Sequence, residues 1–175
     1  MKHRIGVVPL GEVPALVLKV IAANITAFYR CPAAVLPEQT VPASAFDDRR
    51  LQYDAGIIIQ ALGTWAFADC SKVVGVMSRD IFIPIFNYAY GYAVQGGDLA
   101  MVSLFRLNRN ADGSMPPPSL FYERAAKIAL HELGHLFSLF HCDDPECIMH
   151  FSGAIIDLDK IPFYLCPDCE RRLIP

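Results

Sequence analysis

The sequence HELGHLFSLFHCDDPECIM occupies residues 131–149 and decides how the rest of the chain is interpreted. It opens with His131 and His135, which a helix would place one turn apart on the same face, close enough to hold one ion. Glu132 lies about 100° round that helix from His131, where it can reach a water beside the ion without being a ligand. His141 follows six residues after His135. Its ring can join the same ion only if the helix ends between these two histidines.

The three histidines predict a catalytic metal site rather than a structural one. Three protein ligands leave the fourth position of a zinc ion open to water, and zinc lowers the pKa of such a water to about 7. Glu132 would take the proton of the water and pass it to the leaving amine. The alternative is an amphipathic helix with histidines on its solvent-exposed face. The presence of His141 at this spacing disfavours that alternative. We therefore predict a hydrolase, a metalloprotease with zinc ligands His131, His135 and His141 and the catalytic residue Glu132.

A second metal site is predicted from the cysteines. Four of the six lie in the last 34 residues, at Cys142, Cys147, Cys166 and Cys169. Four thiolates in two close pairs are typical of a closed, structural zinc site, and a metal would supply folding energy to a segment with little apolar surface. Two disulfides in a secreted tail are the alternative. The prediction is two zinc ions per chain, one catalytic and one structural, with Cys31 and Cys70 as buried free thiols.

The rest of the chain predicts a sheet with helices packed on it. Apolar residues recur at helical spacing over residues 14–30, and the active-site helix should span about 119–137. Residues 54–62 are apolar throughout and fit helix or strand, although their end favours a strand. A β-α-β start followed by further strands indicates an α+β or mixed α/β domain. Expected strands occupy residues 4–10, 73–77, 87–94 and 100–105.

Composition excludes several classes of protein. The net charge of −3 lacks the basic face that a nucleic-acid binder needs. The hydrophobic content is 54%, but the longest uncharged run, residues 81–97, has 17 residues and is interrupted by Pro84, whereas a spanning helix needs about 20. Glu12 stands where the apolar part of a signal peptide should continue. We expect a cytoplasmic monomer that acts on a peptide or protein substrate and binds neither nucleic acid nor membrane.

Residues 131–149, together with the distal Cys-Pro-Asp-Cys at 166–169, resemble the archaemetzincins, a family of metzincin-type zinc peptidases. The signature of that family is an HExxHxxGxxHC segment, a cysteine five positions later, a methionine two beyond that and a distal CxxC. Residues 74–81 and 87–93 also look like family segments. The resemblance therefore covers most of the chain from about residue 54.

The resemblance implies a metzincin-like fold in two parts. The upper subdomain, residues 1–141, would carry a mixed twisted sheet, the active-site helix and a backing helix. The lower one, residues 142–175, would be a small zinc-knotted subdomain with the Met-turn. The resemblance also implies aminopeptidase-like or other peptidase activity. By position, the family's catalytic zinc ligands match His131, His135 and His141, and its general base matches Glu132. The methionine beneath the metal matches Met149, and the structural zinc ligands match the four C-terminal cysteines.

Two departures bear on the site, one from the archaemetzincin pattern and one from the pattern of some other metzincins. The glycine that ends the helix is Ser138 here, and serine adopts a positive φ less readily than glycine. Three outcomes follow: a turn with ordinary dihedrals, a turn strained by about 1–2 kcal/mol, or a displaced His141. Phe151 stands where some metzincins carry a tyrosine near the metal. These departures motivate an alternative function, a non-catalytic zinc-stabilised module that binds a peptide or partner and has a weak or empty histidine site.

Overall fold

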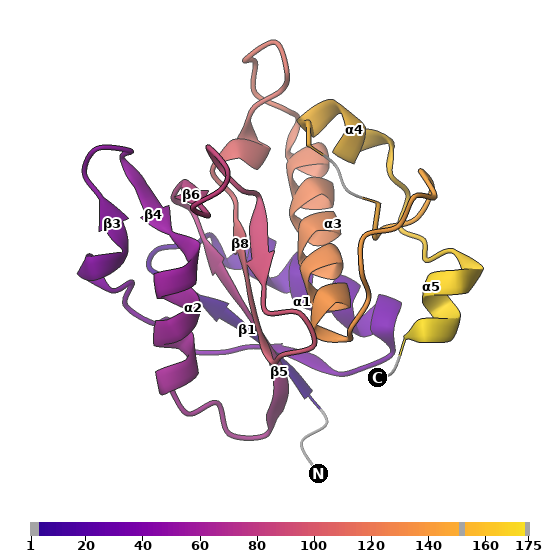
Figure 1. The fold of residues 1–175 in the computed structure, drawn as a ribbon, viewed down its shortest axis with the longest axis horizontal. Helices are drawn as coiled ribbons and strands as arrows, with labels where there is room; N and C mark the ends of the chain where they lie inside the picture. The colour runs from indigo at the N-terminus through magenta and orange to yellow at the C-terminus, as the bar shows by residue number, and fades with distance from the viewer. Residues whose placement is uncertain (1–3, 151–152, 174–175) are drawn as a thin grey trace.

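The computed structural model describes residues 4–150 and 153–173 of the 175-residue chain. Its main sheet has five strands in the order β2-β1-β5-β8-β7 (Figure 1). Four of them are parallel, and β7 pairs antiparallel with β8 at one edge, so the predicted mixed sheet is confirmed. The strands are β1 Arg4–Pro9, β2 Ala33–Val35, β5 Cys70–Met77, β7 Gly91–Ala93 and β8 Leu99–Ser103.

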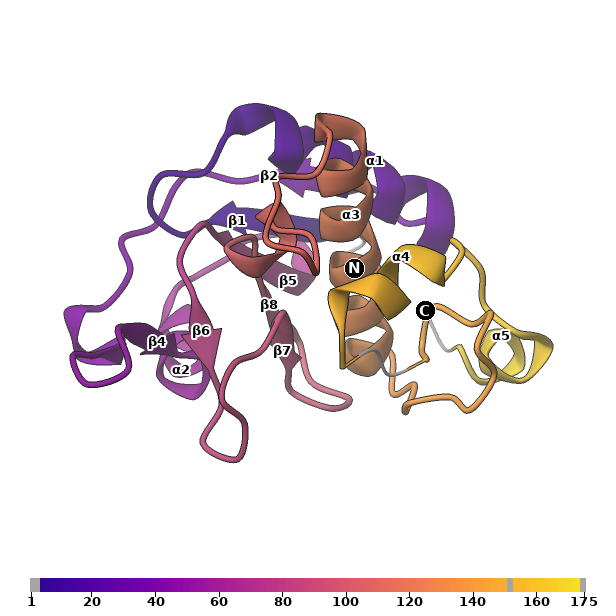
Figure 2. The same ribbon diagram turned by 90° about the horizontal axis from the view of Figure 1, so that it is seen from above.

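Helices cover both faces of this sheet (Figures 1 and 2). Successive residues of a strand point to opposite faces, and Val7 and Val8 of β1 show this alternation. Val7 belongs to the buried cluster that holds α1 (Ala15–Tyr29) and α3 (Pro118–Leu136), whereas Val8 packs with α2 (Ala55–Thr64). The predicted backing helix and active-site helix therefore lie side by side on one face, and the boundaries of both agree with the prediction to within a residue or two.

The preference for a strand at the end of residues 54–62 is wrong, because the segment forms helix α2. The carboxylate of Asp54 accepts hydrogen bonds from the backbone amides of Gly56 and Ile57, at 2.8 and 3.2 Å. Such an N-cap satisfies donors that the first turn of a helix leaves without partners. Ile58 and Leu62, one turn apart, are then fully buried against the sheet.

The strand expected over residues 87–94 is also partly wrong, since only Gly91–Ala93 form β7. Before Tyr90 the chain leaves β8, and Ala89 pairs with Ile81 instead. Ile81 belongs to a small second sheet of three short strands, β3 Phe46–Asp47, β4 Gln52–Asp54 and β6 Ile81–Phe82, in the order β3-β4-β6. Short 3-10 helices lie at Ala43–Ala45 and Arg106–Asn108.

The C-terminal segment packs onto α3 and shares its core. Two short helices, α4 (Ile155–Lys160) and α5 (Pro167–Arg172), follow the predicted Met-turn. Leu158 and Cys169 belong to the same buried cluster as α1 and α3. The hydroxyl of Tyr29, at the end of α1, donates a buried hydrogen bond of 2.7 Å to the carbonyl of Leu130 in α3. None of the helices in the described ranges combines the length and apolarity needed to cross a membrane.

A buried arginine fastens α4 to α3. Arg124 is only 1% exposed, and its guanidinium contacts both carboxylate oxygens of Asp159 in α4 at 2.6 and 2.7 Å. The same guanidinium donates to the backbone carbonyls of Leu107 and Arg109 and to the side chain of Asn110. A buried charge needs an opposite charge and hydrogen bonds to offset its lost hydration, and Arg124 has both.

Candidate active site and metal centres

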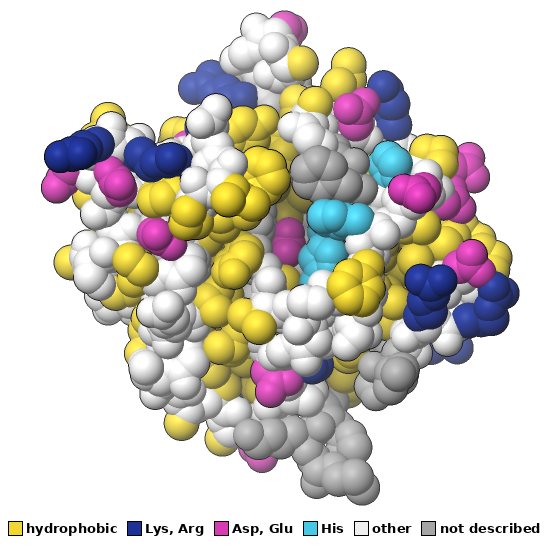
Figure 3. Space-filling model, in the orientation of Figure 1, with side chains coloured by type: hydrophobic (Ala, Val, Ile, Leu, Met, Phe, Trp, Pro, Cys, Tyr) yellow, Lys and Arg dark blue, Asp and Glu magenta, His cyan; other side chains and the backbone are white. Residues whose placement is uncertain are grey.

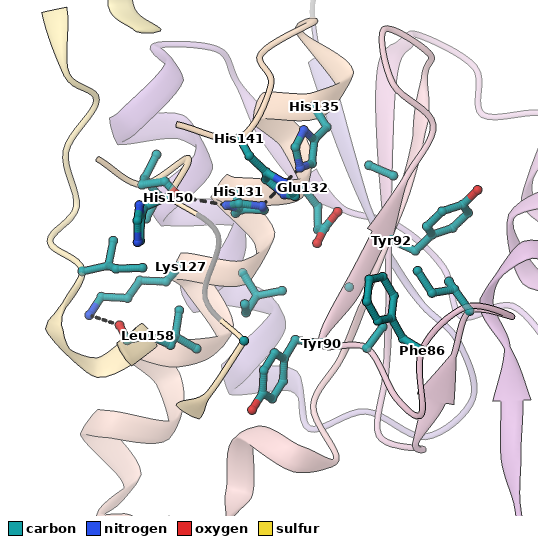
Figure 4. Close-up of a pocket in the computed structure, with 18 of the residues that line it drawn as sticks. Phe86, Tyr90, Tyr92, Lys127, His131, Glu132, His135, His141, His150 and Leu158 are labelled. Carbon is teal, nitrogen blue, oxygen red and sulfur yellow. Dashed lines mark hydrogen bonds between the residues drawn. The ribbon is translucent and has the colours of Figure 1, made fainter. Parts of the chain in front are cut away.

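The three predicted histidine ligands converge on one point beside α3 (Figure 4). Their ligand atoms lie within 4.8 Å of one another. The Nδ1 atom of His131 donates to the carbonyl of Ile148, and that of His135 donates to the carbonyl of Leu139, both at 2.8 Å. Because each Nδ1 carries the proton, each neutral ring presents an unprotonated Nε2, the form that binds a metal. A hydrogen bond from the other ring nitrogen to a carbonyl is typical of metal-binding histidines.

The donor set fits a zinc ion. The Nε2 atoms of His131 and His135 are 3.1 Å apart, which brings two lone pairs face to face. A shared cation stabilises that arrangement, and tetrahedral zinc with bonds of about 2.0–2.1 Å would separate two ligand nitrogens by about 3.3 Å. Burial, more than the neighbouring histidines, lowers the pKa of His131 to about 3. Burial also lowers the pKa values of His135 and His141, so all three rings favour the neutral form.

The turn that delivers His141 contains the strained serine, which is the second of the three outcomes set out above. Ser138 has φ 65°. Its amide donates to the carbonyl of His135 at 3.0 Å, and the amide of Leu139 donates to the carbonyl of Gly134 at 2.9 Å. These two bonds make a Schellman ending, which favours glycine at the left-handed position. The turn therefore has the geometry of a glycine turn with serine in it, and His141 still reaches the site.

Replacing Ser138 with glycine is expected to stabilise the protein. Glycine adopts the left-handed conformation without a clash at Cβ, so the free energy of unfolding should rise by about 1 kcal/mol, or the Tm by about 2–4 °C. Thermal unfolding followed by circular dichroism measures this. Ser119→Gly is the matched control, because that serine lies in the first turn of α3 and glycine should lower stability there. A lower Tm for Ser138→Gly would contradict the assignment of strain.

Glu132 lies next to the histidines with its carboxylate pointing from α3 toward β7 (Figure 4). It is 7% exposed, and burial raises its pKa to about 8. A carboxyl group with a pKa near neutrality suits a general base that must take a proton and give it back. Gly91 of β7 makes room for it, since a Cβ atom there would lie 2.5 Å from Oε1 of Glu132. The sequence did not identify Gly91, because nothing local indicates that β7 approaches this helix.

Replacing Gly91 with alanine is expected to displace the Glu132 carboxylate and to lower kcat/KM by about 10–100-fold, because small misplacements of catalytic groups have effects of that size. Bound metal should be unchanged, since no histidine moves. Gly63→Ala is the control, because the added Cβ would make an ordinary contact of 3.4 Å with Leu99. Peptide hydrolysis and zinc content are measured together. Full activity in Gly91→Ala would mean that Glu132 needs no such space.

The site opens into a cleft of about 620 Å³ between α3, the 83–93 segment and the chain after His141. Figure 3 shows histidine and acidic side chains at a hollow in this face, bordered by hydrophobic ones. The lining includes Ile83, Phe86, Tyr88, Tyr90, Tyr92, Phe140, Ile148, Leu158 and Ile161. Lys127 also borders it, but its ammonium is held by Glu123 at 2.6 Å and by two backbone carbonyls of α4. His150 lines the cleft and was not among the predicted site residues.

The four C-terminal cysteines form a second cluster of possible ligands. Their sulfur atoms lie within 4.8 Å of one another, and those of Cys142 and Cys166 are 3.7 Å apart. Tetrahedral zinc with Zn–S bonds of about 2.3 Å would separate two sulfurs by about 3.8 Å, whereas a disulfide needs about 2.05 Å. None of these four cysteines is in a disulfide, which disfavours the disulfide alternative. Cys70 is buried as expected, but Cys31 is only partly buried.

Met149, the predicted Met-turn residue, is fully buried against α3. Its sulfur packs against Gly134, where a Cβ atom would overlap it. The glycine of the HELGH segment, Gly134, is thus required by packing, a role that the sequence pattern did not reveal. Phe151, discussed above as a departure from the family, lies outside the described residues.

Comparison with known proteins gives one consistent family. Residues 19–174 match the model of "Peptidase family M54". An archaemetzincin from Haloquadratum walsbyi is 34% identical over 172 residues, which is 97% of this chain and 98% of that protein. One from Pyrococcus furiosus is 40% identical over 179 residues, 99% and 93% of the two chains.

Solved structures agree with the sequence comparison. The crystal structure of archaemetzincin from Archaeoglobus fulgidus, complexed with malonate, has a TM-score of 0.82 and 30% identity and covers 97% of this chain and 99% of its own. That of a zinc-dependent peptidase from Methanocorpusculum labreanum has a TM-score of 0.86 and 27% identity over 97% and 100% of the two chains. The α+β fold with a mixed sheet is therefore shared with these proteins.

Proposed function

Since the chain belongs to peptidase family M54 and is a zinc metallopeptidase, we propose that His131, His135 and His141 hold its catalytic zinc and that Glu132 is its general base. The observation that carries this proposal is the convergence of three neutral imidazoles next to one buried carboxyl group. A non-catalytic module would not need that carboxyl group, so this alternative is not favoured.

The proposed mechanism assigns one proton carrier. When bound, zinc supplies the charge that polarises the scissile carbonyl and favours loss of a proton from water. Glu132 accepts that proton and returns it to the nitrogen of the leaving amine as the peptide bond breaks. Its buried position stabilises the protonated carboxyl group between the two transfers. A substrate that fills the apolar cleft would exclude bulk water and strengthen these interactions.

We propose that the substrate lies along β7. This strand is at the edge of the sheet, and it pairs with β8 on one side only. An extended peptide can add to such an edge through backbone hydrogen bonds, while its side chains enter pockets. Gly91 then places the peptide backbone close to Glu132, because the two residues are in contact. The apolar cleft suits uncharged side chains near the scissile bond, since Lys127 is already paired with Glu123.

The proposal includes a second, structural zinc held by Cys142, Cys147, Cys166 and Cys169, and a division into an upper part, 1–141, and a lower part, 142–175. The 3.7 Å spacing of two of the sulfurs supports the ion. The position of the cleft, between α3 and the chain after His141, supports the division. Four clustered cysteines without a disulfide suit a reducing compartment, in line with a cytoplasmic protein, and we retain the prediction of a monomer.

Metal counting tests the ligand assignment. Purified protein is expected to hold two zinc ions per chain by elemental analysis, and His135→Ala is expected to hold one, because two remaining rings bind zinc too weakly. Tyr92→Phe is the matched control: it removes a polar group from the same cleft and should keep both ions. One zinc in both wild type and His135→Ala would instead favour the non-catalytic module.

A further inference from the structure

The two clusters of ligands are joined by one short loop. His141 ends the first cluster and Cys142 begins the second, so neighbouring residues serve different sites. Ile148 lies between Cys147 and Met149, and its carbonyl accepts the hydrogen bond that orients His131. We propose that the four-cysteine centre sets the metal affinity of the catalytic centre, with Ile148 and Cys142 as positioning residues. This inference rests on the proposed assignment of both metal centres.

The first connection runs from Cys147 to His131. Cys147 is fully buried, and its sulfur accepts a hydrogen bond from the amide of Cys166 at 3.4 Å. The next amide, that of Ile148, donates to the carbonyl of Tyr164 at 2.6 Å. Ile148 is therefore held by the same segment that carries the third and fourth cysteines. If that segment becomes mobile, the carbonyl of Ile148 is no longer held in place. That carbonyl sets the ring orientation and the tautomer of His131.

The second connection runs through Cys142 to His141. The amide of Cys142 donates to the carbonyl of Met149 at 2.9 Å, and Nδ1 of His150 donates to the carbonyl of Cys142 at 2.9 Å. These bonds close residues 142–150 into a compact loop. His141 is the most exposed of the three rings and lies beyond the end of α3. Its position therefore depends on the residue that follows it, which the cysteine cluster holds.

The ring of His135 should not be affected by the coupling. His135 is oriented by Leu139, four residues away within the helix ending, and has no bond to the cysteine loop. Loss of the structural ion should leave His135 in place and disturb the other two ligands. Loss of a group that orients a metal ligand typically weakens metal binding by about 10–100-fold. The expected effect is therefore weaker metal binding at the histidine centre rather than its complete loss.

Cobalt binding to the full chain measures this effect. Cys169→Ser breaks the cysteine centre from α5, and Cys70→Ser makes the same change in the separate buried cluster around α2. The dissociation constant of Co²⁺ at the histidine centre, followed by its visible spectrum, should rise about 10–100-fold in Cys169→Ser and less than about twofold in Cys70→Ser. Unchanged affinity in Cys169→Ser, or equal weakening in both variants, would overturn the proposal.

A reciprocal measurement keeps the proposal testable if Cys169→Ser does not fold. Coupling between two sites must be the same in both directions. His135→Ala empties the histidine centre without touching the cysteine loop, so zinc should bind the cysteine centre about 10–100-fold more weakly in this variant than in wild type. Equal affinities in a chelator competition would overturn the coupling. Wild-type protein with a single zinc ion would refute the structural ion itself, and elemental analysis shows that failure separately.

Discussion

Glu132→Gln is expected to lower kcat/KM for peptide hydrolysis by about 10²–10⁴-fold, because the amide can no longer take a proton from water. Zinc content should be unchanged, since Glu132 is not one of the proposed ligands. Burial raises the pKa of this side chain to about 8, so the site tolerates an uncharged group in its place. Glutamine has nearly the same shape and no charge, so the variant should fold normally. Steady-state kinetics and elemental analysis on the same preparation test both points.

Glu123→Gln is the control for this experiment. It makes the same substitution on the same helix, at a side chain that is 41% exposed and does not line the cleft. The ammonium of Lys127 keeps its hydrogen bonds to the carbonyls of Leu158 and Asp159, so the change in kcat/KM should be far smaller than that of Glu132→Gln. Equal loss of activity in the two variants would point to disturbance of α3, and unchanged activity in Glu132→Gln would remove Glu132 from the mechanism.

Arg124→Met is expected to lower the free energy of unfolding by about 3–5 kcal/mol. Methionine fills part of the space but leaves Asp159 without its cation and leaves two backbone carbonyls without donors. Removing one partner of a buried ion pair typically costs this much. Urea unfolding followed by fluorescence measures the change. Because Leu158 of α4 lines the cleft, activity should also fall at urea concentrations that leave the main sheet folded.

Lys160→Met is the matched control. Lys160 forms an ion pair of 3.2 Å with Asp157, but its side chain is 70% exposed. Exposed pairs contribute about 0–1 kcal/mol, so the unfolding midpoint should barely move. A small effect of Arg124→Met, comparable to that of Lys160→Met, would show that Arg124 does not hold α4 in place.

Helix α3 and the convergence of the three histidines were predictable because they depend on local spacing. The four-residue separation of His131 and His135 and the apolar run before them predict the helix, and the structure confirms its extent. The strain at Ser138 was foreseen as one of three outcomes, since it follows from the residue type at one turn. For α2 a local signal existed and was not used: Asp54 before an apolar run is a helix N-cap.

Other features depend on contacts between distant segments and leave no local pattern. Gly91 matters because β7 lies against Glu132, forty-one residues further along the chain. Gly134 matters because the side chain of Met149 crosses it. The shortening of the expected strand to Gly91–Ala93 arises because Ala89 pairs with Ile81 of another sheet. Each of these needs the three-dimensional register of the fold, which the period of a sequence does not contain.

The bond between Tyr29 and Leu130 has a consequence for how the protein is made. These residues are 101 positions apart. At roughly 5–20 residues per second, a ribosome needs about 5–20 s to add that length. During this interval the apolar face of α1, with Val17, Ile21 and Ile25, has no α3 to cover it. The nascent chain therefore exposes a hydrophobic surface for several seconds. That is long enough for a chaperone to bind this surface before α3, which buries it, has been synthesised.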